Sequence, residues 1–206
     1  MLRMSNCEIT SQMMLQVIEN GLCFNSTLLR LDISNNNLNS TVGVRLAQYL
    51  LENTKELVFP PDAENPDIDA EVILTDNTPH LFYLDASHNQ FNVQVASAFA
   101  RTLETYNCLG YLDLSFNDIG DDGAIYLAEA LKNNQTLVEL HLSSNKLTSS
   151  GGIAIAEALK ENETLTTLNL SKNKLGDTTA FAISDAIAQN KALTTLLISS
   201  AMLSNE

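Results

Sequence analysis

The sequence predicts an α/β solenoid in which parallel strands line a concave face and α-helices cover the convex face. An eleven-residue pattern, Leu-x-x-Leu-x-Leu-x-x-Asn-x-Leu, recurs every 28 residues, starting at Leu81, Leu109, Leu137, Leu165 and Leu193. After each pattern the apolar period changes from two residues to that of a helix. One such strand–turn–helix unit cannot bury its own apolar face, so neighbouring units must stack.

The N-terminal units are the least regular. Residues 1–27 match only the second half of the pattern, with Cys7 where asparagine usually stands. A full match begins at Leu28 and predicts a repeat over 28–56. Residues 57–80 hold all four prolines of the chain, and proline both removes backbone donors and ends helices. We therefore expect a degenerate repeat with a protruding acidic loop there.

The acidic residues of this loop invite comparison with a calcium site. The acidic residues are Asp62, Glu64, Asp67, Asp69, Glu71 and Asp76. No lysine or arginine lies between them in the sequence. Their spacing does not match the twelve-residue calcium loop of a helix–loop–helix site. A solvated loop is the favoured interpretation, and we expect no metal.

The C-terminal units follow the pattern closely. Within the second of them, Ala124, Leu127, Ala128 and Leu131 form one helical stripe, which predicts an amphipathic helix after the strand and turn. The predicted units are the repeats 81–108, 109–136, 137–164 and 165–192, followed by a terminal partial repeat at 193–206.

The period, the Leu/Asn frame and the helix sequence Gly-Ala-x-x-Leu-Ala-x-Ala-Leu resemble the leucine-rich repeats of the ribonuclease-inhibitor type. This resemblance covers nearly the whole chain. It implies a single domain over 1–206 with the shape of a horseshoe arc. It also implies a role in protein–protein interaction, because that is what the repeat class mostly does. Parallel strands need helical crossover connections, which agrees with the pattern itself.

The asparagine of the pattern has a structural interpretation. Its side-chain amide can both donate and accept, so it can bond the turn backbone of its own unit and of the adjacent unit. Asn134 and Asn162 recur at the exit of the predicted helices, and we read them first as turn residues. The expected asparagine ladder consists of Asn36, Asn89, Asn117, Asn145 and Asn173.

Alternate residues of each strand are expected to face the concave surface, because the leucines between them point into the core. Adjacent strands lie about 4.8 Å apart, so two neighbouring units can form one patch of aromatic and charged residues. Exposed aromatics mixed with charge are typical of interface hot spots, although aromatics are also simply good strand residues. The candidate protein-binding residues are Tyr83, Asp85, His88, Tyr111, Asp113, Phe116, Asp118, Glu139 and His141.

Composition and charge exclude several classes of partner. The 206 residues carry a formal charge of −14, which argues against nucleic acid and against anionic membranes. No apolar run is long enough to span a bilayer, and neither a signal peptide nor a metal motif is evident. Cys7, Cys23 and Cys108 cannot all pair within one chain, so we expect a reducing, cytoplasmic location. No cofactor-binding motif occurs, and we expect no cofactor.

The charge is concentrated in one part of the chain. Residues 61–130 hold 13 acids and one base, Arg101, while each flank is close to neutral. We therefore expect a protein partner with a basic surface at the acidic and aromatic part of the concave face.

Three other functions are compared with that of a non-catalytic binding module. A regulator of a small GTPase often needs an arginine near the phosphates, and only Arg30 is predicted on the concave face. An enzyme is not expected, because His80, His88 and His141 are scattered and no catalytic motif occurs. A secreted bacterial effector acting inside a host cell, or a receptor fragment, would use the same repeats for recognition. Uncapped ends would allow self-association.

Overall fold

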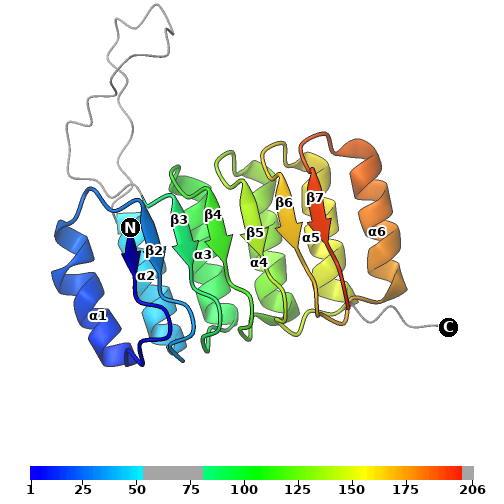
Figure 1. The fold of residues 1–206 in the computed structure, drawn as a ribbon. Coiled ribbons are helices and arrows are strands. Elements are labelled where there is room, and N and C mark those ends of the chain that lie inside the picture. The colour runs from blue at the N-terminus through cyan, green and yellow to red at the C-terminus, as the bar shows by residue number, and fades with distance from the viewer. Residues whose placement is uncertain (53–80, 201–206) are drawn as a thin grey trace, which may run out of the picture.

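The computed structural model describes residues 1–52 and 81–200, in which seven parallel strands form one sheet in sequence order. Six α-helices cover one face of this sheet and leave the other face open (Figure 1). The strands are β1 (Leu2–Arg3), β2 (Arg30–Asp32), β3 (Tyr83–Asp85), β4 (Tyr111–Asp113), β5 (Glu139–His141), β6 (Thr167–Asn169) and β7 (Thr195–Leu197). The helices are α1 (Ser11–Asn20), α2 (Ser40–Glu52), α3 (Val93–Thr105), α4 (Gly120–Asn133), α5 (Ser149–Glu161) and α6 (Gly176–Gln189), with a short 3₁₀ helix, η1 (Leu22–Phe24). This is the predicted leucine-rich-repeat solenoid.

The strand register places equivalent pattern positions beside one another. Tyr83 pairs with Tyr111, which pairs with Glu139, and Asp85 pairs in the same way with Asp113 and His141. β2 and β3 are direct neighbours, with Arg30 beside Tyr83, although residues 53–80 separate them in sequence. The degenerate repeat predicted at 57–80 lies outside the described residues.

The core lies between the sheet and the helices. The central leucines of the strands, such as Leu84, Leu112 and Leu140, are fully buried, as is the stripe of α4 that contains Ala124 and Leu127. Small residues bring the helices close to one another. A Cβ added at Gly152 in α5 would lie 2.5 Å from Cγ2 of Thr179 in α6.

The pattern asparagines lie buried where the strands turn toward the helices. Asn117 donates through Nδ2 to the carbonyl of Ala86 in the preceding unit and to those of Leu114 and Ser115 in its own turn. Its Oδ1 accepts from the backbone N–H of Phe91. Equivalent bonds at Asn36, Asn89, Asn145 and Asn173 join each described unit to the one before it.

A second asparagine ladder lies at the other end of the strands, where each helix is followed by the loop to the next strand. Asn134, Asn162 and Asn190 each follow one helix and donate to a carbonyl near the end of the helix in the preceding unit. These bonds run to Leu103, Leu131 and Leu159, at 2.7, 2.7 and 2.6 Å respectively. Their Oδ1 atoms accept from two backbone N–H groups of the following turn. Tyr106 takes the equivalent place one unit earlier, and its hydroxyl donates to the carbonyl of Leu81.

Candidate functional site

The open face of the sheet carries a row of stacked aromatic side chains. The rings of Tyr83 and Tyr111 stack with centroids 4.0 Å apart and planes inclined by 14°. His141 on β5 tilts against Tyr111 at 5.1 Å, and the guanidinium of Arg30 on β2 lies 4.8 Å from the centroid of Tyr83. The register of the four strands therefore assembles one continuous row from Arg30 to His141.

A second stack lies on the turns that follow β3 and β4. The rings of His88 and Phe116 are 3.9 Å apart and inclined by 12°, and the Lys172 ammonium lies 5.2 Å from the Phe116 centroid. Both aromatic residues have left-handed backbone, with φ of 53° and 55°. The same turn position has left-handed backbone in the other described units, at Asn35, Ser144, Lys172 and Ser200, so this conformation belongs to the turn of the repeat. We call Tyr83, Asp85, His88, Tyr111, Asp113 and Phe116 the acid–aromatic patch.

Two carboxylates lie beside the tyrosines. Asp85 and Asp113 are paired in register on adjacent strands, and each accepts a bond from the backbone N–H two residues later. Burial raises the pKa of Asp113, and the nearby Asp85 carboxylate raises it further, while bonds from Ser115 lower it. The patch therefore holds negative charge in a partly desolvated setting, which a cationic partner group would relieve.

The three remaining predicted residues lie at the margins of the patch, and all three interact with other side chains of the chain. Asp118 forms a 2.7 Å ion pair with Lys146, and Glu139 lies 3.4 Å from the imidazole of His141. Asp113 and His141 are cross-strand neighbours, as expected. The sequence could not show that Lys146 would neutralise Asp118, because the contact depends on how two turns face each other.

Burial also raises the pKa of both tyrosines of the patch. Nearby aspartate carboxylates act in the same direction, because a phenolate would be repelled by them. A hydrogen bond between the two side chains raises the pKa of Tyr111 and lowers that of Tyr83, and both phenols are neutral at physiological pH.

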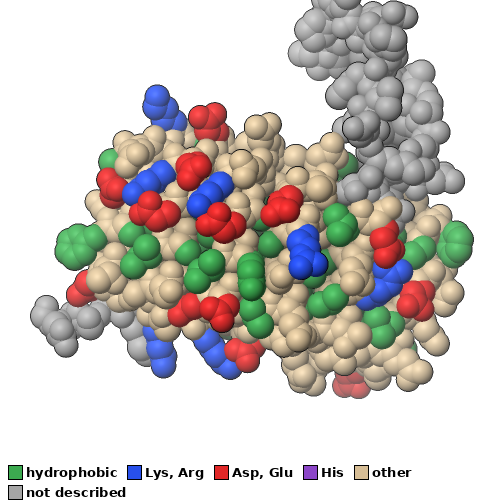
Figure 2. Space-filling view, turned by 180° about the vertical axis from the view of Figure 1, so that it is seen from behind, with side chains coloured by type: hydrophobic (Ala, Val, Ile, Leu, Met, Phe, Trp, Pro, Cys, Tyr) green, Lys and Arg blue, Asp and Glu red, His purple; other side chains and the backbone are tan. Residues whose placement is uncertain are grey.

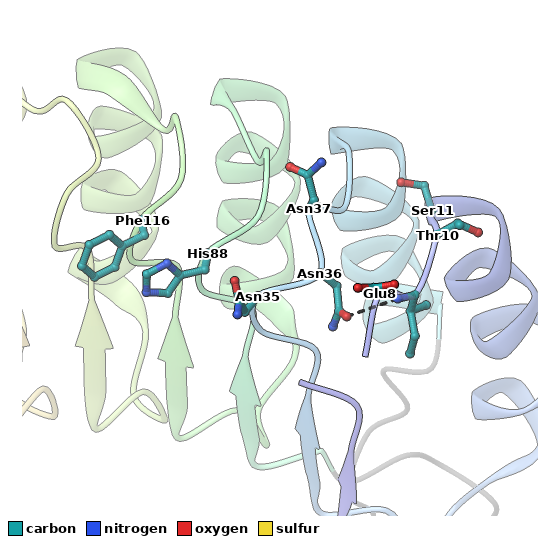
Figure 3. A pocket seen from close by; sticks show the side chains of 9 residues that line it. Glu8, Thr10, Ser11, Asn35, Asn36, Asn37, His88 and Phe116 are labelled. Atoms are coloured by element: carbon teal, nitrogen blue, oxygen red, sulfur yellow. Dashed lines mark hydrogen bonds between the residues drawn. The ribbon is translucent and has the colours of Figure 1, made fainter. Parts of the chain in front are cut away.

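An open groove of about 630 Å³ lies beside the His88–Phe116 stack. We call it the turn-edge groove. Figure 3 shows that His88 lies between Phe116 and Asn35, and that Glu8 lies on the other side of Asn36. The turn-edge groove is lined by Glu8, Ile9, Thr10, Ser11, Asn35, Asn36, Asn37, His88 and Phe116. Of these, sequence analysis selected His88 and Phe116 as binding residues and Asn36 as a structural asparagine, and it predicted no binding residue in the turns of the first two units.

The helical face differs in charge from the strand face. Acidic and basic side chains alternate over the helices in Figure 2, and several are paired, as Lys160 is with both Glu157 and Asp185. Over residues 1–52 and 81–200, no cluster of His, Cys, Asp and Glu has the arrangement of a metal site, and no helix is long and apolar enough to cross a membrane.

The parallel sheet and its buried asparagine ladder define a leucine-rich-repeat solenoid. The chain belongs to the family of the TMOD/LMOD leucine-rich domain, whose model matches residues 68–196, more than half of the chain. The ribonuclease-inhibitor type remains a prediction.

Among solved structures, the chain is similar to one described as "Leiomodin-1 Actin-Binding Site 2 (ABS2)". The two sequences are 28% identical, the match covers 53% of this chain and 69% of that chain, and the TM-score is 0.48. A search of curated proteins finds no match.

Proposed function

We propose that the chain is a non-catalytic protein-recognition module that binds a partner with a basic surface through the acid–aromatic patch. The observation that carries the proposal is the pair of ring stacks, Tyr83–Tyr111 and His88–Phe116, flanked by Asp85 and Asp113 on one open sheet face. Rigid aromatic side chains beside partly desolvated carboxylates are the composition of an interface hot spot.

The cations already present in the chain support the expected partner chemistry. Arg30 lies over Tyr83 and Lys172 lies over Phe116, so both stacks already attract positive groups. The two aspartates between them offer acceptors for further arginine or lysine side chains. Membership of the TMOD/LMOD family agrees with protein binding, and no observation on the described residues favours small-GTPase regulation.

The proposal includes a cytoplasmic location. The thiols of Cys7 and Cys23 are free and exposed. Exposed free thiols persist most readily in a reducing compartment.

The test is affinity capture with the 206-residue chain in three forms: wild type, Tyr83→Ala/Tyr111→Ala, and the control Thr167→Ala/Thr195→Ala. The control pair occupies the same register positions on β6 and β7, outside the patch. Actin, which the description of the leiomodin-1 structure names, is assayed directly as one arm by co-sedimentation. We expect the tyrosine variant to lose about tenfold in affinity for the specific partner, because hot-spot truncation has effects of that size.

Binding should also weaken between about 0.1 M and 1 M salt, because screening over this range shortens the Debye length from about 10 to 3 Å. Thermal unfolding of each variant separates loss of binding from loss of fold. Equal recovery of every partner by all three forms would contradict the proposal.

A further inference from the structure

A row of apolar residues lies at the starts of four neighbouring strands. Its members directly precede β2 to β5, and they are Leu29, Phe82, Gly110 and Val138. Backbone bonds join them in order, from the N–H of Phe82 to the carbonyl of Leu29, from Gly110 to Phe82 and from Val138 to Gly110, at 3.0, 2.9 and 2.8 Å. The side chains of Leu29, Phe82 and Val138 are 54%, 49% and 37% exposed. We call these four residues the strand-start ledge.

Phe82 lies across the glycine beside it. A Cβ added at Gly110 would lie 2.0 Å from Cε2 of Phe82, so the ring fills the space that a side chain at position 110 would need. Because Gly110 is the direct neighbour of both Phe82 and Val138, the ring spans the space between them. An aromatic ring over a cross-strand glycine stabilises a sheet. About half of this ring is nevertheless exposed, so the contact with glycine leaves a large apolar surface uncovered.

The ledge ends at the same unit as the row of candidate binding residues on the concave face. In the next two units Thr166 and Thr194 take the ledge position, and their hydroxyls donate to backbone carbonyls of the preceding unit. The concave face changes at the same place, from His141 on β5 to Asn169 on β6. Single exposed apolar residues are normal on a protein surface. A row of them that ends together with the concave row indicates one continuous surface.

The ledge and the aspartates lie within reach of one short segment. Asp113 is three residues after Gly110, and a strand rises about 3.3 Å per residue, so the carboxylate lies about 10 Å along β4 from the Phe82 ring. Two residues on the same face of an extended chain are about 7 Å apart. A long cationic side chain covers the remaining distance.

We propose that the strand-start ledge and the acid–aromatic patch together bind one short segment of the protein partner, in which a large apolar residue lies within four residues of an arginine or lysine. The apolar side chain packs on Phe82, Leu29 and Val138, and the cation lies between Asp85 and Asp113. This inference rests on the proposed function, to which it adds the apolar anchor and the spacing of the partner residues.

Charge and polarity favour this occupant over two others. A wholly apolar segment would cover Asp85 and Asp113 without offering them a charged or hydrogen-bonding partner, which is costly. A second copy of the chain would place like surfaces together, because a two-fold interface sets the same patch against itself. The aspartates of the two copies would then repel each other, and the formal charge of −14 opposes such pairing further.

The experiment is a selection of random twelve-residue peptides displayed on phage against the immobilised 206-residue chain. Recovered peptides are then synthesised and used as probes for affinity measurements. We expect them to share a large apolar residue and an arginine or lysine within four positions of it. Replacing either residue of the probe by alanine should lower its affinity about tenfold, the size expected for an anchor residue.

Protein variants assign the apolar residue of the probe to the ledge. Phe82→Ala should weaken binding about tenfold, whereas the matched control Tyr126→Ala should leave it unchanged, because Tyr126 is an aromatic residue on α4 with the same exposure of 49%. The probe that lacks its apolar residue should bind Phe82→Ala and wild type equally, since the two changes remove one contact. Gly110→Ala keeps Phe82 but displaces its ring, so it should also weaken binding.

A second pair of variants assigns the cation of the probe to the aspartates. Asp85→Asn/Asp113→Asn should weaken binding about tenfold and remove most of its dependence on salt, because the attraction that salt screens is lost. The matched control is Glu104→Gln/Glu161→Gln, two exposed carboxylates on α3 and α5, which should leave binding unchanged. Thermal unfolding of every variant separates loss of binding from loss of fold.

The outcomes separate this inference from the proposed function. A selection that recovers no peptide, peptides without the apolar and basic pair, or probes that bind Phe82→Ala as tightly as wild type would each overturn the inference. Partner capture with Tyr83→Ala/Tyr111→Ala tests the proposed function without reference to the ledge. If that variant alone loses the partner, the proposed function stands and the ledge has no part in it.

Discussion

At the residue scale, the most informative side chain is Asp113. It was predicted as a binding residue from its place in the pattern, and the register does place it beside Asp85, Tyr111 and His141. Its raised pKa could not be predicted, because that depends on how deeply the folded chain buries the carboxyl group and on how near Asp85 lies. A carboxylate with a raised pKa in the folded state destabilises the fold whenever it is ionised.

We therefore expect Asp113→Asn to stabilise the protein at neutral pH. Below the ordinary carboxyl pKa of 3.8, Asp113 is protonated in both the folded and the unfolded state, so the variant gains nothing there. The gain grows as pH rises through that value and reaches its full size above the raised pKa of the folded state. Asparagine can keep the bond accepted from the Ser115 N–H.

The measurement is the free energy of unfolding of both proteins by denaturant at a series of pH values. Asp118→Asn is the control, because that carboxylate is exposed and paired with Lys146. A difference between wild type and Asp113→Asn that is constant from acid to neutral pH would contradict the prediction.

At the element scale, the leucine frame predicted each strand from β2 to β7 and the helix that follows each of β2 to β6. The prediction succeeds because the pattern has a period of two residues in the strand and a helical period after it. In each case only one face of the element can bury the leucines. The pattern did not reveal the turn-edge groove, since Glu8 and Asn35 come together only when irregular turns of successive units stack. It also did not reveal the full helix-exit ladder, where Tyr106 stands in the asparagine position.

Close packing between helices gives a prediction at this scale. Gly152→Ala places a Cβ 2.5 Å from Cγ2 of Thr179, so α5 and α6 must move apart. We expect a net loss of about 1–3 kcal/mol in the free energy of unfolding, as for other overpacked cores. The better helix propensity of alanine offsets part of it.

Denaturant unfolding of Gly152→Ala, Thr179→Ala and the double variant measures this contact. Removing the Thr179 methyl makes room, so the double variant should lose less stability than the sum of the two single variants. Ser150→Ala, an exposed change in the same helix, is the control. Additive losses would show that the two side chains do not meet.

At the scale of the whole molecule, each described unit contacts chiefly its neighbours, so stability should vary along the solenoid. α4 packs between α3 and α5 and buries six of its residues, whereas α1 buries only Met14 and Ile18. In α6, Phe181 and Ile187 remain exposed. The central units therefore have packing on both sides, and the outer units have it on one side.

Hydrogen exchange followed residue by residue should reflect this difference. After correction for intrinsic rates, we expect the amides of α1 and α6 to exchange at least about tenfold faster than those of α4. Similar protection in all three helices would mean that the described units unfold as one cooperative body instead of from the ends.

The two asparagine ladders have a consequence for recognition. One ladder hydrogen-bonds successive units to each other after the strands, and the other does so after the helices. These two rows of hydrogen bonds leave neighbouring units little freedom to slide or rotate against each other. The open sheet face is therefore a stiff template, shaped before any partner arrives, and little conformational entropy is lost there on binding. Such a surface selects partners by their fit to a fixed outline, so any adjustment on binding must come from the partner.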